Sequence, residues 1–108
     1  MLNKNINPYK QKKWIRKKEY ILSKYNYECQ ESKRYPKERG TTAEVVHHIY
    51  QIEKYPELMF EDWNLLPLST KKHNKMHKRK THELTKLGMQ WQRKRIREFE
   101  RWKEEGII

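Results

Sequence analysis

Two groups of histidines hold the side chains of this sequence that are best suited to chemistry. His47 and His48 close a run of β-branched residues, and His73 and His77 follow with three residues between them. On a helix, positions i and i+4 lie one turn apart on one face, so His73 and His77 could bind one metal ion. A third ligand must come from elsewhere, and the His47-His48 pair is the nearest source. The pattern indicates a histidine metal site.

The same pair could also supply a base. Neighbouring side chains of a strand point to opposite faces, so one imidazole could bind the metal while the other stays outside the ligand set. An imidazole with a pKa of about 6.5 suits proton abstraction at neutral pH. One metal with three histidine ligands leaves open positions for phosphate and water, as phosphodiester hydrolysis requires. The alternative, a closed structural zinc site, more often uses cysteine. His82 has no partner at a useful spacing and is expected at the surface.

The charge of the chain indicates a polyanionic partner. Its 108 residues include 26 Lys and Arg against 14 Asp and Glu, a formal net charge of +12. A field of this sign favours nucleic acid, although a solubility charge or a ribosome-like basic protein would share it. Binding should then weaken steeply with salt. The residues expected to contact DNA phosphates are Lys12, Lys13, Arg16, Lys17, Lys72, Lys75, Arg93, Arg95 and Arg97.

The elements that position these residues follow from hydrophobic periodicity and turn residues. We expect a helix over residues 9–26, with Trp14, Ile21 and Leu22 on a narrow apolar face. A strand should cover 43–49, a packed loop 50–63, and a second apolar run 64–68, broken at Pro67.

Three helices are predicted in the second half of the chain. The first covers 70–79 with Ser69 or Thr70 as its N-cap, and a short one capped by Thr81 ends before Gly88. A long basic helix covers 89–105, with its tryptophans packed against the domain.

Length and composition fit one small domain. Only 34% of residues are hydrophobic and 37% are charged, so the core is thin, with four Trp and seven Tyr supplying large apolar area. The single cysteine, Cys29, excludes an intramolecular disulfide and favours a reducing compartment. The N-terminus lacks the apolar core of a signal peptide, and no apolar run approaches the ~20 residues that cross a bilayer. We expect a soluble, intracellular α+β protein.

The order of the motifs resembles the HNH (ββα-metal, or His-Me finger) endonucleases, in particular the small HNH proteins of bacteriophages and prophages. The resemblance covers roughly residues 9–88 and rests on Tyr27-x-Cys29, Val46-His47-His48-Ile49, Asn64-Leu65 and His73-Asn74-Lys75-Met76-His77. It implies a flexible tail over 1–8, an HNH nuclease domain over 9–88 and a C-terminal basic helix over 89–108. The expected fold is a ββα-metal core with flanking basic helices at both termini.

The resemblance also implies a role for each site residue. His47 would bind the metal, His48 would be the general base that activates water, and Asn64 would brace the loop that positions the base. His73 matches an established metal position. His77 matches a terminal histidine that binds metal in some members and contacts phosphate in others. We therefore assign His48 and Asn64 to catalysis, and His47, His73 and His77 to the metal.

The sequence departs from the family pattern at two places, one at the expected catalytic metal and one at the structural zinc of many relatives. Many relatives carry an aspartate at the position of His47, and an all-imidazole set favours Mn, Ni, Zn or Co over Mg. The cofactor is thus a divalent ion, Mn, Ni, Zn or Mg, with Mg the least suited.

The second departure concerns the structural zinc that many phage members hold with two C-x-x-C pairs. Those positions read Cys29, Ser32, Ser69 and Lys72 here, so no structural zinc is expected. Packing of residues such as Tyr27, Tyr35 and Trp63 should hold the segment around Cys29 in place of the zinc. Cys29 itself should be buried as a small apolar residue.

The function that the resemblance implies is a metal-dependent DNA endonuclease that nicks DNA or cuts both strands. It would be phage-derived and would act on DNA in the cytoplasm of a bacterial host. Because such genes often lie beside those of the packaging terminase, terminase subunits are expected partners by analogy. Two alternatives stay open, a non-catalytic DNA-binding or packaging accessory with a structural metal site, and an RNase or toxin nuclease.

Overall fold

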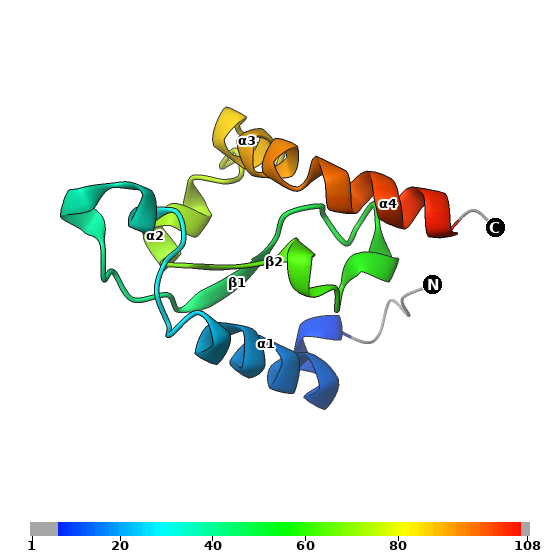
Figure 1. Ribbon diagram of the computed structural model, residues 1–108, viewed down its shortest axis with the longest axis horizontal. Helices are drawn as coiled ribbons and strands as arrows, with labels where there is room; N and C mark the ends of the chain where they lie inside the picture. Colours follow the sequence, from blue (N-terminus) through cyan, green and yellow to red (C-terminus); the bar gives the residue numbers. More distant parts are fainter. Residues whose placement is uncertain (1–6, 107–108) are drawn as a thin grey trace.

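The computed structural model describes residues 7–106, in which helices cover a small central sheet (Figure 1). Its elements are α1 (Lys12–Lys24), β1 (Val45–His48), β2 (Leu65–Leu68), α2 (Thr70–Asn74), α3 (Lys86–Lys94) and α4 (Ile96–Gly106). Short 3-10 turns lie at Pro8–Lys10, Ser32–Arg34, Pro36–Glu38, Pro56–Leu58 and Asp62–Asn64. In Figure 1, α1 lies on one side of the sheet and α3 and α4 on the other. The expected α+β class is confirmed.

The two strands pair antiparallel, and their register sets the depth of the histidines. His47 lies opposite Leu66 and His48 opposite Leu65, next to the long loop that joins the strands. Pro67 lies within β2 opposite Val46, so the predicted break there is wrong. A strand of a two-stranded sheet is also an edge, where proline is tolerated because it need not donate to a neighbour. The Pro67 carbonyl accepts from the backbone N–H of Gln30 at 3.0 Å.

The first helix buries the face that the sequence predicts. Trp14, Ile21 and Leu22 are buried, whereas most of its lysines and arginines are exposed. It starts at Lys12 and not at residue 9, because Pro8–Lys10 forms a separate 3-10 turn that Asn7 caps. The expected flexible tail over 1–8 falls largely outside the described residues. None of the helices between residues 7 and 106 is long and apolar enough to cross a membrane.

The helix that carries His73 is much shorter than expected. Ser69 is its N-cap, and its Oγ accepts from the backbone N–H of Lys72 at 3.2 Å, but the helix ends at Asn74 and not at residue 79. His77 then pairs with Leu84 in an antiparallel bridge, so residues 77–84 form a hairpin. The assumption that His73 and His77 share one helix face is therefore wrong.

Two further helix boundaries differ from the prediction. Thr81 caps no helix, because it lies in this hairpin; Thr85 caps α3 instead, and its Oγ1 accepts from the Gly88 N–H at 3.3 Å. The expected long helix is divided at Arg95, which has φ −114° and ψ 16°. α3 also spans the expected domain boundary between residues 88 and 89.

Aromatic side chains fix the C-terminal helices to the rest of the molecule. Phe99 of α4 stacks on Tyr50 with ring centroids 4.0 Å apart, and Trp102 packs against Phe99 and Tyr55. Trp91 of α3 is buried and its Nε1 donates to the Glu31 carboxylate at 2.9 Å. The expectation that the tryptophans pack against the domain is confirmed.

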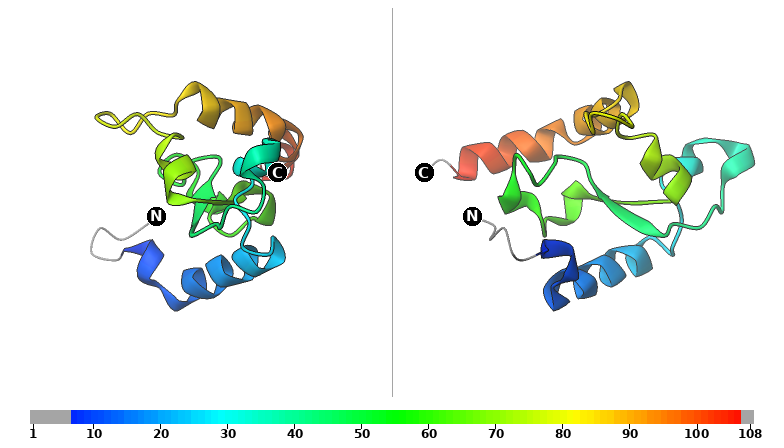
Figure 2. Two further views of the ribbon diagram at one scale, coloured as in Figure 1. Left: turned by 90° about the vertical axis from the view of Figure 1, so that its left-hand side faces the viewer. Right: turned by 180° about the vertical axis from the view of Figure 1, so that it is seen from behind.

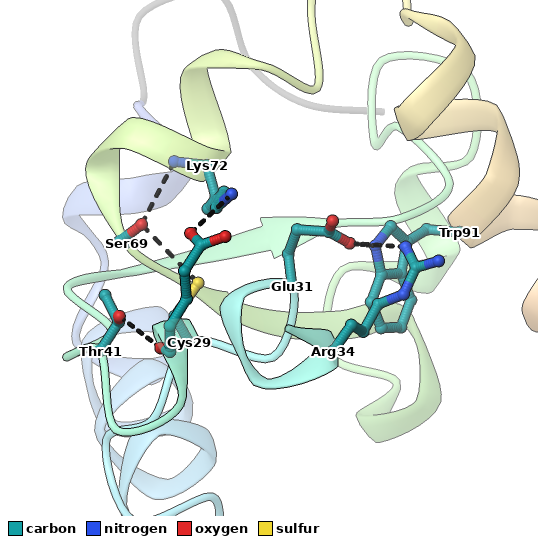
Figure 3. A network of polar contacts seen from close by, with 8 residues as sticks. Cys29, Glu31, Arg34, Thr41, Ser69, Lys72 and Trp91 are labelled. Atoms are coloured by element: carbon teal, nitrogen blue, oxygen red, sulfur yellow. Dashed lines mark hydrogen bonds and ion pairs between the residues drawn. The ribbon is translucent and has the colours of Figure 1, made fainter. Parts of the chain in front are cut away.

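Polar contacts hold the knuckle, which comprises residues 27–42 (Figure 3). Cys29 is fully buried, as expected, with its Sγ 3.6 Å from Ser69 Oγ. The Lys72 ammonium pairs with the Glu38 carboxylate at 3.0 Å. Buried Glu31 joins the knuckle to α3 through Trp91 and also pairs with Arg34 at 2.9 Å.

These contacts correct two expectations. Tyr27 and Tyr35 are 41% and 43% exposed, so they do not form the packing that was predicted to hold the knuckle. Lys72 is buried and engaged by Glu38, so its ammonium is not presented to a DNA phosphate.

Candidate metal centre

Three histidines from different elements meet at one end of the sheet. His47 comes from β1, His73 from α2 and His77 from the hairpin 77–84. One ring nitrogen of each lies within 4.8 Å of the others, close enough to share a metal ion. The ring centroids are 5.2 to 5.9 Å apart. The structure thus unites the three predicted ligands, although His77 arrives from a hairpin and not from the helix.

The environment of His47 fits a cation. The residue is 2% exposed, and its buried Nε2 has no hydrogen-bond partner among the described residues. Burying a polar atom without a partner costs about 1–3 kcal/mol, a penalty that a bound cation would remove. Burial, and then the neighbouring His73 and His77, lower the pKa of His47 well below its usual value. Burial and His77 likewise lower the pKa of His73. Neutral imidazoles are the form that binds metal.

The hairpin fixes the orientation of His77. Its Nδ1 lies 3.2 Å from the backbone carbonyl of His82. A carbonyl oxygen only accepts, so Nδ1 carries the hydrogen and Nε2 keeps its lone pair. His82 is exposed, as expected, but its backbone contact with His77 could not be predicted from the sequence.

His48 lies outside this cluster, in a separate aromatic pocket. Its ring stacks on Trp14 of α1, with centroids 4.8 Å apart and planes at 29°. Its Nε2 lies 3.1 Å from the Met59 carbonyl and must donate to it, so Nδ1 is the free acceptor. Burial lowers the pKa of His48, while the Met59 carbonyl and Glu53 oppose that shift. The ring is therefore neutral near pH 7 and can take up a proton.

Asn64 closes the loop that supplies the Met59 carbonyl. The side chain is fully buried, and its Oδ1 accepts from the Tyr50 N–H at 2.7 Å. Its Nδ2 donates to the carbonyls of Tyr50 and Leu58, at 3.0 and 3.3 Å. Asn64 thus joins both ends of the loop that connects the strands. These bonds hold the loop that carries the Met59 carbonyl, the partner of His48.

The two histidine environments open into one cleft of about 390 Å³. His47, His48, His73 and His77 all line it, together with Tyr9 and Trp14 on the α1 side. A second, larger groove of about 1100 Å³ shares Tyr9, His73 and His77, and continues along the hairpin. The hairpin reaches away from the body of the molecule in the left view of Figure 2. An extended polymer could thus pass over the histidines.

Some of the basic residues expected to contact DNA are exposed, and others are held by contacts within the protein. Exposed members are Lys12, Lys13, Arg16, Lys75, Arg93 and Arg97. Lys17 is paired with Asp62, and the Arg95 guanidinium lies 5.6 Å from the centre of the Trp91 ring. Three consecutive basic residues that were not among those expected to contact DNA, Lys78, Arg79 and Lys80, are exposed in the hairpin after His77. The basic run itself was the signal for them, but it lay at the end of the helix predicted over 70–79.

His47 and His48 lie on β1, and His73 and His77 follow β2, within a fold of two antiparallel strands and helices that matches the ββα-metal arrangement. Neither a scan of protein-family models nor a search of curated proteins finds a match. Among solved structures, the chain is similar to the crystal structure of the HNH endonuclease of the deep-sea thermophilic bacteriophage GVE2 with manganese ion. The two share 29% sequence identity with a TM-score of 0.56, over 61% of this chain and 70% of that one. The resemblance to the HNH family is confirmed, and it supports a nuclease function.

Proposed function

We propose that this protein is a metal-dependent DNA endonuclease. The observation that carries the proposal is the buried Nε2 of His47, which lacks a protein partner among residues 7–106 and belongs to a three-histidine cluster. A divalent cation held by His47, His73 and His77 would stabilise negative charge on the scissile phosphate and the leaving oxygen. The cleft beside the cluster admits solvent and substrate, as a catalytic site requires and a closed structural site does not.

His48 supplies the base in this proposal. Its Nδ1 is free to accept a proton from a water molecule, because Nε2 is occupied by the Met59 carbonyl. The Trp14 stack and the loop closed by Asn64 hold the ring in place. A base fixed before the substrate arrives avoids reorganisation during the reaction.

Manganese or nickel should serve better than magnesium. Imidazole is a softer ligand than carboxylate, and the hard Mg²⁺ ion prefers oxygen. The similar GVE2 endonuclease was crystallised with manganese ion, which supports the same choice here.

DNA is the proposed substrate, because basic residues line the cleft and the groove that adjoins it. Lys18 of α1 lines the cleft, and Lys78 of the hairpin lines the groove. Residues 9–88 form the proposed nuclease domain, with α4 and much of α3 as a basic addition. A phage origin is supported by the phage source of the similar structure. A link to packaging terminase rests on analogy alone.

The test is cleavage of supercoiled plasmid by metal-stripped protein with Mg, Mn, Ni or Zn restored. We expect nicking that needs an added ion and is faster with Mn or Ni than with Mg. His48→Ala should lower the rate by roughly 10²–10⁴-fold while metal affinity and melting temperature stay near wild type. The exposed Lys37→Ala serves as a surface control.

Three outcomes would contradict parts of the proposal. Equal or faster cleavage in Mg alone would overturn the metal assignment. Salt-sensitive DNA binding without cleavage under any ion would make the protein a DNA-binding accessory. Preferential cleavage of RNA under the same conditions would make it an RNase.

A further inference from the structure

The hairpin 77–84 is built so that one backbone carbonyl faces a metal ligand. His77 pairs with Leu84 across the hairpin, and the Lys78 N–H donates to the Glu83 carbonyl at 2.6 Å. The His82 N–H donates back to the Lys78 carbonyl at 2.9 Å. The His82 carbonyl is then left to accept from His77 Nδ1.

His82 adopts a backbone conformation that few residues favour. Its φ is +60°, in the left-handed region that glycine and asparagine enter easily and β-branched residues avoid. This conformation reverses the chain and directs the carbonyl of residue 82 back towards His77. The side chain of His82 takes no part in that contact, because the acceptor is a backbone atom.

The base of the hairpin is fixed by contact with α3. A Cβ atom at Gly88 would lie 2.8 Å from the Met76 carbonyl oxygen and 2.7 Å from a Leu84 methyl carbon. Thr85 adds two hydrogen bonds to the turn that precedes His77, to the Lys75 carbonyl at 2.6 Å and the Met76 carbonyl at 2.9 Å. The close approach at Gly88 therefore helps to hold this turn in place.

We infer that His82 is a positioning residue whose backbone carbonyl holds His77 with Nε2 directed to the metal. Metal-binding histidines commonly donate their second ring nitrogen to such an acceptor, and loss of the acceptor weakens metal binding by roughly 10–100-fold. Gly88 supports the arrangement by allowing α3 to pack on the hairpin base. The inference rests on the proposed metal site and adds a partner to one of its ligands.

The first experiment measures binding of Mn²⁺ and Co²⁺ to the full chain by calorimetry, with three substitutions of one residue. His82→Gly and His82→Asn accept the left-handed conformation and should keep wild-type affinity. His82→Val resists it and should weaken binding by roughly 10–100-fold. Loss in all three would show that the imidazole itself matters and would overturn the inference, as would no loss in any. No binding by wild type would refute the proposed metal site itself.

Two further measurements do not depend on activity. Gly88→Ala should push α3 from the hairpin base and weaken metal affinity, while its melting temperature shows whether the fold persists. NMR of ring nitrogens in the metal-free wild type should show His77 protonated at Nδ1. His82→Val should show a mixture of tautomers. A His77 protonated at Nε2 in the wild type would overturn the inference even if a variant failed to fold.

Discussion

His47 and His48 are neighbours in sequence, yet strand geometry places them in different environments. His47 faces two histidines, whereas His48 faces an indole and a carbonyl. The alternation of side chains along β1 therefore separates the proposed ligand, His47, from the proposed base, His48, although the two are adjacent in sequence. The pairing with β2 maintains this separation, because a slip of one residue would exchange the two environments.

Changing the chemical nature of one ligand should change the preferred ion. We predict that His47→Asp raises the plasmid-cleavage rate in Mg relative to that in Mn by roughly tenfold, because carboxylate oxygen is the harder ligand. Cleavage by wild type and variant across a titration of each ion measures the ratio. An unchanged ratio would show that His47 does not contact the ion. His73→Ala is the control and should lose activity with every ion.

At this scale the sequence was sufficient to select the candidate ligands but not to orient their rings. Spacing and residue type predicted His47, His73 and His77, and the structure brings these three together. The nitrogen that each ring presents depends on partners distant in sequence, such as the Met59 carbonyl for His48. Such partners are backbone atoms. Every residue type has the same backbone carbonyl, so the sequence does not indicate which residue supplies the contact.

At the scale of elements, the loop between the strands supports His48, the proposed base. It carries Met59, and its two ends are joined by one asparagine side chain. The loop can therefore hold His48 in a fixed position although it is long. Because hydrogen bonds join the loop ends next to the sheet, the Met59 carbonyl that contacts His48 moves little relative to the strands.

Removal of that asparagine should affect stability and rate but not metal binding. Asn64→Ala leaves buried backbone groups of Tyr50 unpaired, at about 1–3 kcal/mol for each unsatisfied group. We expect a lower free energy of unfolding in urea, slower cleavage and an unchanged metal affinity. The exposed Asn74→Ala is a matched control with little effect. Wild-type stability in Asn64→Ala would contradict the bracing role.

The sequence predicted those elements correctly that depend on the local hydrophobic pattern. It failed for elements whose bounds depend on contacts between residues distant in sequence. The strand that includes Val45 and the apolar face of α1 follow from periodicity, and both are present. The helix after Ser69 was predicted too long, because its basic residues are compatible with a helix while the hairpin is fixed by packing on Gly88. The division at Arg95 likewise lets Trp91 and Phe99 reach separate partners.

At the scale of the whole molecule, the histidines make stability depend on pH. The pKa values of His47, His48 and His73 are lowered in the folded protein, so the unfolded chain binds more protons below its own pKa of about 6.5. Stability is fully present above that pH and is lost as the pH falls towards the folded values. Each excess proton changes the free energy of unfolding by about 1.4 kcal/mol per pH unit.

Thermal melts of metal-free protein between pH 5 and 8 test this dependence. We expect the melting temperature to fall steadily below pH 6.5 and to level off above it. His47→Gln should flatten the profile, because one of the titrating groups is removed. A melting temperature that stays constant from pH 7 to pH 5 would show that the histidines protonate freely in the folded state.

The contacts described for the knuckle are hydrogen bonds and ion pairs, together with one buried thiol. These contacts join the segment to α2 and α3 through protein side chains. If the ion binds at the proposed histidine site, a chelator would abolish activity while the contacts of the knuckle stay in place, and adding metal would restore activity. The supply of free metal in the cell would then limit how many folded molecules can cut.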